Sequence, residues 1–209
     1  MERGKFITIE GTEGVGKSTN VAFIKAWLES RDIPLVLSRE PGGTPLAEEI
    51  RDLLLVPRDE IMDETTELLL MFASRSQHLH RLIEPALQAG KWVLCDRFTD
   101  ASFAYQGGGR GIDITKIEAL ENVVQGSVRP DLTFILDIDV QTGLERARAR
   151  GELDRIEVES IEFFERVRQA YLNRANANPE RYRVINAGQL LEGVQADIES
   201  VLEALEGRF

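Results

Sequence analysis

The sequence predicts an α/β fold, a five-stranded parallel sheet flanked by helices on both faces. First, five short apolar runs have the length expected of buried strands. These runs lie at residues 6–10, 35–37, 91–97, 131–137 and 183–186. Second, segments with helical periodicity alternate with them, which is typical of a parallel sheet. Third, 209 residues with 43% hydrophobic content suit a single domain, 1–209, with a substantial core.

The first apolar run leads directly into a glycine-rich motif. Residues 11–18 fit G-x-x-x-x-G-K-[ST], the phosphate-binding P-loop. Its glycines let backbone N–H groups curl around an anion, and the following helix directs its positive end at that anion. The alternative is a chance glycine loop, but the strand before it and the amphipathic pattern of Val21, Ile24 and Leu28 after it favour a nucleotide site. The predicted nucleotide contacts are Gly11, Thr12, Glu13, Gly14, Val15, Gly16, Lys17, Ser18 and Thr19.

Two helices are expected between the second and third apolar runs. The loop at 39–45, rich in proline and glycine, precedes a helix at 46–55. In that loop, Arg39 and Glu40 either belong to a plain connection or present their side chains to a ligand. A longer helix is expected at 64–89, where Pro85 should kink or restart it and Gly90 should end it.

The long helix carries an aromatic side chain next to a cationic one. Phe72 and Arg75 are three residues apart and therefore share a helix face. This pair suits a flat base, which can be stacked and hydrogen-bonded. Phe72 also lies among Leu68, Leu69 and Met71, and spacing alone favours a place in the core over a role at a base.

The third apolar run ends in Asp96 and Arg97. Ligands of open parallel sheets bind at the carboxyl ends of strands. An acidic residue there suits a Walker-B-like role at Mg²⁺ beside the Ser18 hydroxyl, and an arginine suits a phosphate clamp. An ion pair at the strand end is the alternative, and the P-loop upstream favours the functional role.

Glycine dominates residues 105–111, which we expect to form a surface loop, because such a composition disfavours regular structure. Helices are then expected at 115–124, 141–150, 161–175 and 190–205. Arg146, Arg148 and Arg150 lie on the second of these, and Gly151 should end it. The cluster is either a solvated helix face or part of a lid, about 141–156, whose arginines close over a triphosphate.

Composition limits the partners and the compartment. The net charge of −11 weighs against a nucleic-acid polymer as partner, because backbone binding needs a basic surface. No stretch has the length of a membrane span, and the N-terminal residues lack the apolar core of a signal peptide. The lone Cys95 excludes an internal disulfide and fits a cytoplasmic location.

Taken together, the motifs resemble those of bacterial thymidylate kinases, a family of P-loop nucleoside-monophosphate kinases. The resemblance covers essentially the whole chain, because its motifs follow one another in the family's order. They are the P-loop segment 10–18, Arg39-Glu-Pro-Gly-Gly43, Phe72 with Arg75, Asp96-Arg97-Phe98 and Tyr105-Gln-Gly-Gly-Gly-Arg110. The resemblance implies transfer of the γ-phosphate of ATP to dTMP, with Mg²⁺ as cofactor. It also implies a mobile lid and a homodimer.

Roles for individual residues follow from the resemblance alone. It implies that Ser18 and Asp96 organise Mg²⁺, and that Lys17, Arg97 and Arg150 are catalytic. The P-loop positions 12–15 hold no arginine, which matches the subgroup that supplies its catalytic arginine from the lid; Arg150 is the best match, with Arg146 also at the nucleotide. The implied dTMP contacts are Glu13, Arg39, Phe72, Arg75, Arg97, Ser102, Tyr105 and Gln106.

Three other functions compete with this interpretation. A GTP-dependent switch usually carries D-x-x-G and N-K-x-D, and neither occurs in the sequence. An ATPase that moves nucleic acid is disfavoured by the acidic charge. A P-loop kinase acting on another deoxynucleoside or monophosphate is separated from dTMP phosphorylation only by the resemblance.

Overall fold

The computed structural model describes residues 3–149 and 154–206. Its centre is one five-stranded sheet in the order β2-β3-β1-β4-β5, and every strand pairing is parallel. The strands are β1 (Phe6–Glu10), β2 (Leu35–Arg39), β3 (Trp92–Asp96), β4 (Leu132–Asp137) and β5 (Tyr182–Asn186). The predicted α/β class and the five parallel strands are confirmed.

Helices occupy every connection between consecutive strands and follow the last strand. They are α1 (Lys17–Glu29), α2 (Pro45–Leu55), α3 (Glu64–His78), η1 (Leu79–Ile83), α4 (Glu84–Gln88), α5 (Thr99–Ser102), η2 (Phe103–Gly109), α6 (Ile114–Gln125), α7 (Val140–Arg148), α8 (Ile161–Ala177) and α9 (Leu191–Glu206). The segments η1 and η2 are π-helical. Among the described residues, none of these helices is long and apolar enough to cross a membrane.

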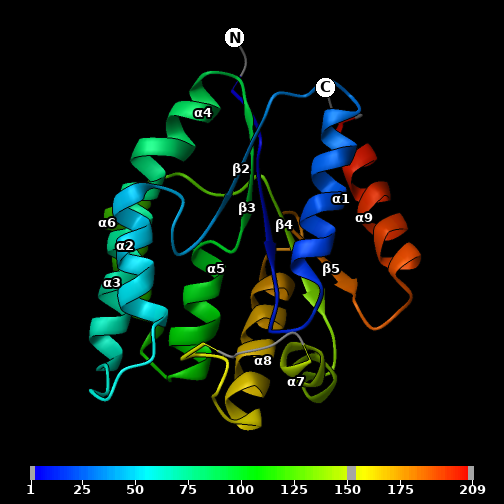
Figure 1. Cartoon of the computed structure of the whole chain (residues 1–209). Coiled ribbons are helices and arrows are strands. Elements are labelled where there is room, and N and C mark those ends of the chain that lie inside the picture. The colour runs from blue at the N-terminus through cyan, green and yellow to red at the C-terminus, as the bar shows by residue number, and fades with distance from the viewer. Residues whose placement is uncertain (1–2, 150–153, 207–209) are drawn as a thin grey trace.

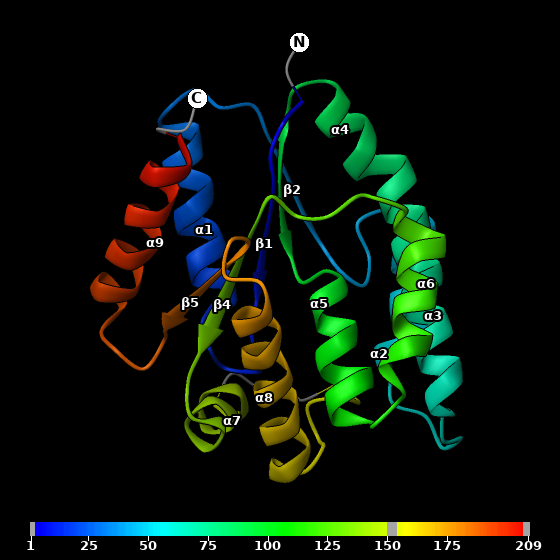
Figure 2. The same ribbon diagram turned by 180° about the vertical axis from the view of Figure 1, so that it is seen from behind.

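Helices cover both faces of the sheet, as the sequence predicts (Figures 1 and 2). On one face α1 and α9 pack side by side over a core built from β1, β4 and β5. On the other face α4 and η1 cover β1 and β3, and α8 with η2 covers β4. Beyond η2, α3 and α6 add a further apolar cluster, and α2 packs on α3.

Strand register brings the candidate site residues to one edge of the sheet. Asp96 is the partner of Ile9 on one side and of Arg39 on the other. All strands run in parallel, so the P-loop after β1 begins beside Asp96 and Arg39. The expected adjacency of Asp96 to the P-loop strand is therefore confirmed.

The expected surface loop at 105–111 is wrong. Residues 103–109 form the π-helical segment η2, which continues α5, and most of this segment is buried. The glycines serve close packing: a Cβ on Gly108 would lie 2.7 Å from Ala170 Cβ, and one on Gly109 would lie 2.4 Å from the Phe163 ring. A glycine-rich segment disfavours an isolated helix. This segment is helical here because it packs closely on α8, a contact that side chains at Gly108 and Gly109 would prevent.

The long helix expected at 64–89 consists of three helical segments in succession. The π-helical η1 separates α3 from α4, and α4 begins at Glu84 with Pro85 in its first turn. Proline has no N–H to donate and fits the first turn of a helix. The sequence predicts a kink or a restart at Pro85; the structure has a π-helical segment directly before it, and the backbone stays helical through the junction.

Two glycines let α7 lie directly against the P-loop. A Cβ on Gly14 would lie 1.9 Å from the Gly143 carbonyl oxygen, and a Cβ on Gly143 would lie 2.5 Å from the Glu13 carbonyl oxygen. Gly14 also has φ +69°, a conformation that suits glycine. The start of the predicted lid segment is thus in backbone contact with the phosphate loop.

We predict that Gly143→Ala destabilises the fold and weakens ATP binding. Alanine normally stabilises a helix relative to glycine, but at this position its Cβ must displace the P-loop backbone. Overpacking of this kind costs about 1–3 kcal/mol. Thermal unfolding should therefore show a Tm lower by several degrees, and titration calorimetry a weaker ATP complex.

Gly193→Ala is the matched control, because Gly193 also lies within a helix, α9. A Cβ there would meet only the flexible Gln189 side chain, at 2.9 Å from its Oε1. We expect the control to keep or raise the Tm. A Tm that rises equally in both variants would show that the α7 contact does not constrain the P-loop.

Candidate active site

A cavity of about 530 Å³ opens at the carboxyl ends of β1, β2 and β3. The P-loop, the ends of β2 and β3, and the helices α2, α3, α5 and η2 all contribute to its wall. Most of the residues that the sequence predicts for the site line this one cavity. They are Glu13, Gly14, Val15, Gly16, Lys17, Ser18, Thr19, Arg39, Arg75, Asp96, Arg97, Ser102, Tyr105, Gln106 and Arg146.

Three of the predicted residues do not line the cavity in the described part of the chain. Gly11 and Thr12, at the start of the P-loop, are buried, and their carbonyls accept hydrogen bonds from Lys17 Nζ at 3.2 and 2.9 Å. Phe72 is 2% exposed and packs in a cluster with Leu68 and Phe103. Arg150 lies outside the described residues.

Lys17 follows Gly16 at the first position of α1. Burial lowers the pKa of its ammonium, and the nearby positive charge of Arg97 lowers it further. Within residues 3–149 and 154–206, its hydrogen-bond acceptors are two carbonyls of the loop that it belongs to. The ammonium is therefore a concentrated positive charge inside the loop, where a phosphate oxygen would be a stronger partner.

Arg97 joins β3 to the P-loop through a strained backbone. Its φ of +67° lies in the left-handed region, which is uncommon for residues other than glycine. The guanidinium donates to the Gly11 carbonyl at 2.8 Å and to Glu13 Oε1 at 2.6 Å. Burial by itself lowers the pKa of Arg97, but the Tyr105 phenol and the Glu13 carboxylate raise it well above its usual value. The charge of Arg97 is thus held at the cavity wall in one orientation.

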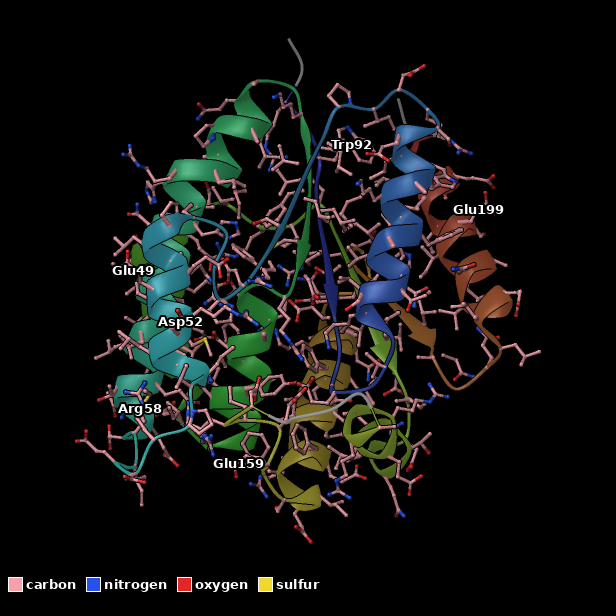
Figure 3. The ribbon with its side chains drawn as sticks, in the orientation of Figure 1. Glu49, Asp52, Arg58, Trp92, Glu159 and Glu199 are labelled. Carbon is pink, nitrogen blue, oxygen red and sulfur yellow. The ribbon has the colours of Figure 1, made fainter. Side chains whose placement is uncertain are left out.

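Sequence reasoning missed Arg51, which also lines the cavity. Arg51 donates to the Pro41 carbonyl at 2.8 Å, and its pKa is lowered by burial and by the charge of Arg39. Its neighbours Glu49 and Asp52 are exposed at the outer side of α2, which Figure 3 shows. The signal was present in the sequence: Arg51 falls on the same helix face as the fully buried Ala47 and Leu54.

Arg39, Arg51 and Arg97 place three positive charges on the wall of one cavity. Arg39 is partly neutralised by Glu48 at 3.0 Å. The lowered pKa of Arg51 has the charges of both other arginines among its causes, so an anion between them would relieve the repulsion. This geometry suits a second phosphate, apart from the one that the P-loop binds.

Asp96 and Ser18 fit a magnesium ion. Both side chains line the cavity, and Asp96 Oδ1 is buried without a hydrogen-bond partner among the described residues. A buried carboxylate oxygen with no donor is costly unless a cation or water satisfies it. Magnesium prefers oxygen ligands and is commonly held by one or two carboxylates together with substrate phosphates.

Arg75, Ser102 and Gln106 form a hydrogen-bonding wall between α3 and the α5–η2 helix. Arg75 donates to Glu40 Oε2 at 2.8 Å, to Ser102 Oγ at 3.1 Å and to the Phe98 carbonyl at 3.2 Å. Its guanidinium lies 4.6 Å from the centre of the Phe72 ring. Phe72 therefore supports Arg75 from within the core, and its predicted stacking on a base stays a prediction.

Glu40, which the sequence left open, faces the site. Its other oxygen, Oε1, lies 2.9 Å from His78 Nδ1, and His78 Nε2 lies 2.6 Å from Ser38 Oγ. His78 is fully buried and joins β2 and its following loop to α3. Glu40 is thus a fixed support for Arg75.

Tyr105 lies beside the P-loop. Its hydroxyl donates to Glu13 Oε1 at 2.8 Å, the same oxygen that binds Arg97. Tyr105 also lies under the Arg97 guanidinium, 4.9 Å from the ring centre. Glu13, Arg97 and Tyr105 therefore form one connected group at the cavity. All three are predicted dTMP contacts, although they lie far apart in the sequence.

Glu10 is a buried acid that sequence reasoning did not assign. Its Oε1 accepts the Phe98 N–H at 2.7 Å, and its Oε2 accepts the Tyr171 hydroxyl at 2.8 Å. Burial raises the pKa of Glu10 to about 8, and the neighbouring Asp100 acts in the same direction. Glu10 fixes the backbone directly after the strained Arg97 and so holds the turn after β3 in place.

The fold and this site define a P-loop phosphotransferase. The phosphate loop, a carboxylate that can bind magnesium and a cluster of three arginines line one cavity. Comparison with known proteins narrows the class. The family model for thymidylate kinase matches residues 9–198, and the chain belongs to the thymidylate kinase family. The resemblance drawn from the sequence motifs is confirmed.

Individual relatives agree over nearly the whole chain. The chain is 61% identical to the thymidylate kinase of Teredinibacter turnerae over 96% of its own length and 98% of the relative's. It is 60% identical to that of Ectopseudomonas mendocina over 97% and 96%. The crystal structure of thymidylate kinase from Ehrlichia chaffeensis superposes with a TM-score of 0.79 at 36% identity, covering 96% of this chain and 99% of that one.

Proposed function

We propose that this chain transfers the γ-phosphate of ATP to dTMP, forming dTDP and ADP, with Mg²⁺. Family membership supports the reaction, and one structural observation supports the chemistry. The P-loop with Lys17 and the cluster of Arg39, Arg51 and Arg97 line the same cavity. A donor phosphate and an acceptor phosphate can therefore meet within it.

In the proposed reaction an oxygen of the dTMP phosphate attacks the γ-phosphorus of ATP, and the bond to the β–γ bridging oxygen breaks. The attacking group is a phosphate monoester with a second pKa of about 6, so it is already largely ionised at neutral pH. The step therefore needs no general base. Its barrier falls through alignment of the two phosphates and neutralisation of their charge.

Each group has a part in that neutralisation. Lys17 binds the β- and γ-phosphates, and Ser18 with Asp96 would hold Mg²⁺, which supplies further positive charge to the phosphates when bound. Arg97 and Arg39 hold the dTMP phosphate, and Arg51 joins them. In this proposal Glu13 binds the sugar, and Arg75, Ser102 and Gln106 bind the base.

The acceptor specificity is tested with a panel of substrates. ADP formation from ATP would be measured with dTMP, dUMP, dCMP, dGMP and thymidine. We expect the highest kcat/KM for dTMP, because the chain belongs to the thymidylate kinase family and the wall of Arg75, Ser102 and Gln106 offers hydrogen bonds to a base. A clearly better acceptor among the others would replace dTMP in the proposal, and thymidine as best acceptor would reject a monophosphate kinase altogether.

We propose further that the segment around 141–156 acts as a lid and that Arg150 contacts the transferring phosphate. The support is indirect: Arg146 from α7 lines the cavity, and Asp154, Ile156 and Glu157 on the far side of the segment line it too. Charge brought by a closing segment would act on the transition state.

Arg150→Ala should lower kcat by about 10³-fold, the lower range seen for arginine fingers, with little change in the Kd for dTMP. Arg148→Ala is the matched control, because Arg148 is exposed at the end of α7 and does not line the cavity. Steady-state kinetics and dTMP titration separate the two quantities. Equal losses in kcat and in dTMP affinity would indicate a structural arginine instead.

We also propose that the protein is a homodimer that associates through α2 and α3. The packed pair of helices exposes Leu46, Leu53 and Leu69, each about half accessible. Sedimentation equilibrium should give twice the 23.5 kDa chain mass. Leu53→Glu should yield monomers and Leu190→Glu, beyond β5, should not; a monomeric parent protein would contradict the proposal. The cytoplasmic location stays a prediction.

A further inference from the structure

Glu67 is a buried carboxylate to which distant parts of the chain donate hydrogen bonds. It lies in the first turn of α3, and its side chain is 2% exposed. Gln106 Nε2 donates to its Oε1 at 2.8 Å, and Arg155 Nη2 donates to its Oε2 at 2.6 Å. Arg110 adds two longer contacts, at 3.4 Å to Oε1 and 3.3 Å to Oε2. Both oxygens are therefore fully engaged.

The charges around Glu67 keep it ionised. Burial by itself raises the pKa of Glu67, but the hydrogen bond from Gln106 and the charges of Arg110 and Arg155 lower it below its ordinary value. Glu159 pairs with Arg110 on the other side, so two carboxylates balance two guanidiniums. At neutral pH Glu67 has no proton to donate and can only accept hydrogen bonds.

This fixes the orientation of the Gln106 amide. An amide has a donor end, NH₂, and an acceptor end, the oxygen. A carboxylate can accept a hydrogen bond from the NH₂ group but not from the amide oxygen. The ionised Glu67 therefore requires that Nε2, and not Oε1, of Gln106 faces it. Gln106 lines the cavity beside Arg75 and Ser102. Glu67 takes one of the two N–H donors of Nε2, and no residue of the described chain donates to the amide oxygen. The acceptor that the amide offers to a ligand there is this oxygen, Oε1.

We propose that Glu67 is a specificity-determining positioning residue: by holding Nε2 of Gln106 it makes Gln106 a hydrogen-bond acceptor toward the base of the acceptor nucleotide. The consequence is selection for pyrimidines that carry a hydrogen on N3, thymine and uracil, over cytosine. The inference rests on the proposed function, because it needs the base of a pyrimidine monophosphate at this wall.

Base chemistry explains the selection. Neutral thymine and uracil have an N3–H donor, whereas cytosine has a lone pair on N3. An amide oxygen pairs with the donor, but faces the cytosine lone pair as a second acceptor and leaves both groups unsatisfied. A site built to bond one pattern rejects the other strongly. Arg75, which only donates, complements a carbonyl of the same base.

The test is Glu67→Gln, measured with three acceptors. A glutamine at 67 can donate or accept, so the Gln106 amide is free to take either orientation. We expect the ratio of kcat/KM for dTMP over dCMP to fall at least about 10-fold, the effect of one orientation-specific hydrogen bond. The dTMP over dUMP ratio should stay unchanged, since both bases carry N3–H. Where dCMP turnover is too slow, its inhibition constant against dTMP replaces kcat/KM.

Two further variants separate positioning from general structure. Glu121→Gln removes a helix carboxylate that pairs with Arg129 at 3.0 Å and does not line the cavity, so both ratios should persist. Gln106→Met removes the amide, and in that background Glu67→Gln should cause no further change in the dTMP over dCMP ratio. A Glu67→Gln variant that loses kcat/KM equally for all three acceptors would show a purely structural role and overturn the proposal.

Folding failure of Glu67→Gln would leave the inference testable. In that case Gln106→Met decides alone: a fall in the dTMP over dCMP ratio supports the proposal, and an unchanged ratio rejects it. The acceptor panel on the parent enzyme separates failure of the proposed function from failure of the role proposed for Glu67. If that enzyme does not prefer dTMP in the acceptor panel, the proposed function fails first; if it does and the variants leave the ratio intact, only the role of Glu67 fails.

Discussion

Hydrogen bonds between the carboxyl ends of β1 and β3 hold the P-loop and the turn after β3 together, and the rest of the site depends on them. Arg97 bonds the Gly11 carbonyl and the Glu13 carboxylate, and Glu10 bonds the Phe98 backbone. The first pair of contacts fixes the P-loop, and the second fixes the turn that carries Arg97 in its left-handed conformation. Because the two strands are register partners in the sheet centre, neither turn can move without the other. The P-loop and the arginine at the end of β3 are thereby held in one relative position.

Charge at the site runs opposite to charge on the molecule. The chain carries −11 overall, yet Lys17, Arg39, Arg51 and Arg97 all face one cavity. Among the described residues, six cationic and five acidic side chains line the cavity, so the lining has a small excess of positive charge while the chain as a whole is acidic. Such a cavity favours substrates with several phosphates and concentrates them from solution. The acidic exterior, with Glu49 and Asp52 on α2, in turn disfavours a polyanionic partner.

The proposed base recognition rests on a helix that its composition disfavours. Gly107 to Gly109 would weaken an isolated helix, but they let η2 approach α8 closely. The π-helical segment η2 brings both Tyr105 and Gln106 to the cavity; Tyr105 bonds Glu13 of the P-loop, and Gln106 bonds Glu67. Single π-type turns are frequent at functional sites, where they re-aim side chains. Packing energy from α8 thus maintains a recognition geometry that local propensity opposes.

The sequence alone determined the fold class, the P-loop and the position of Asp96 beside it. These features depend on local chemistry: apolar periodicity, a glycine turn before a helix, and a charged residue at the end of a strand. The family resemblance added base-site residues such as Gln106, most of which line the cavity. Two further residues could have been identified from the sequence. Arg51 and Glu67 are charged residues on helix faces that are otherwise buried.

Only the tertiary structure decided which partner each of those charges has. Segment 105–111 is helical because α8 packs on it, and Phe72 is buried because α6 and η2 enclose it. The hydrogen-bond partners of Glu67 are distant in the sequence: Gln106, Arg110 and Arg155 are separated from it by 39, 43 and 88 residues. Such contacts depend on how helices pack across the sheet, and packing at that distance leaves no periodic trace in the sequence. The phosphate loop can therefore be recognised from eight residues, whereas the orientation of one amide at the base site requires the folded chain.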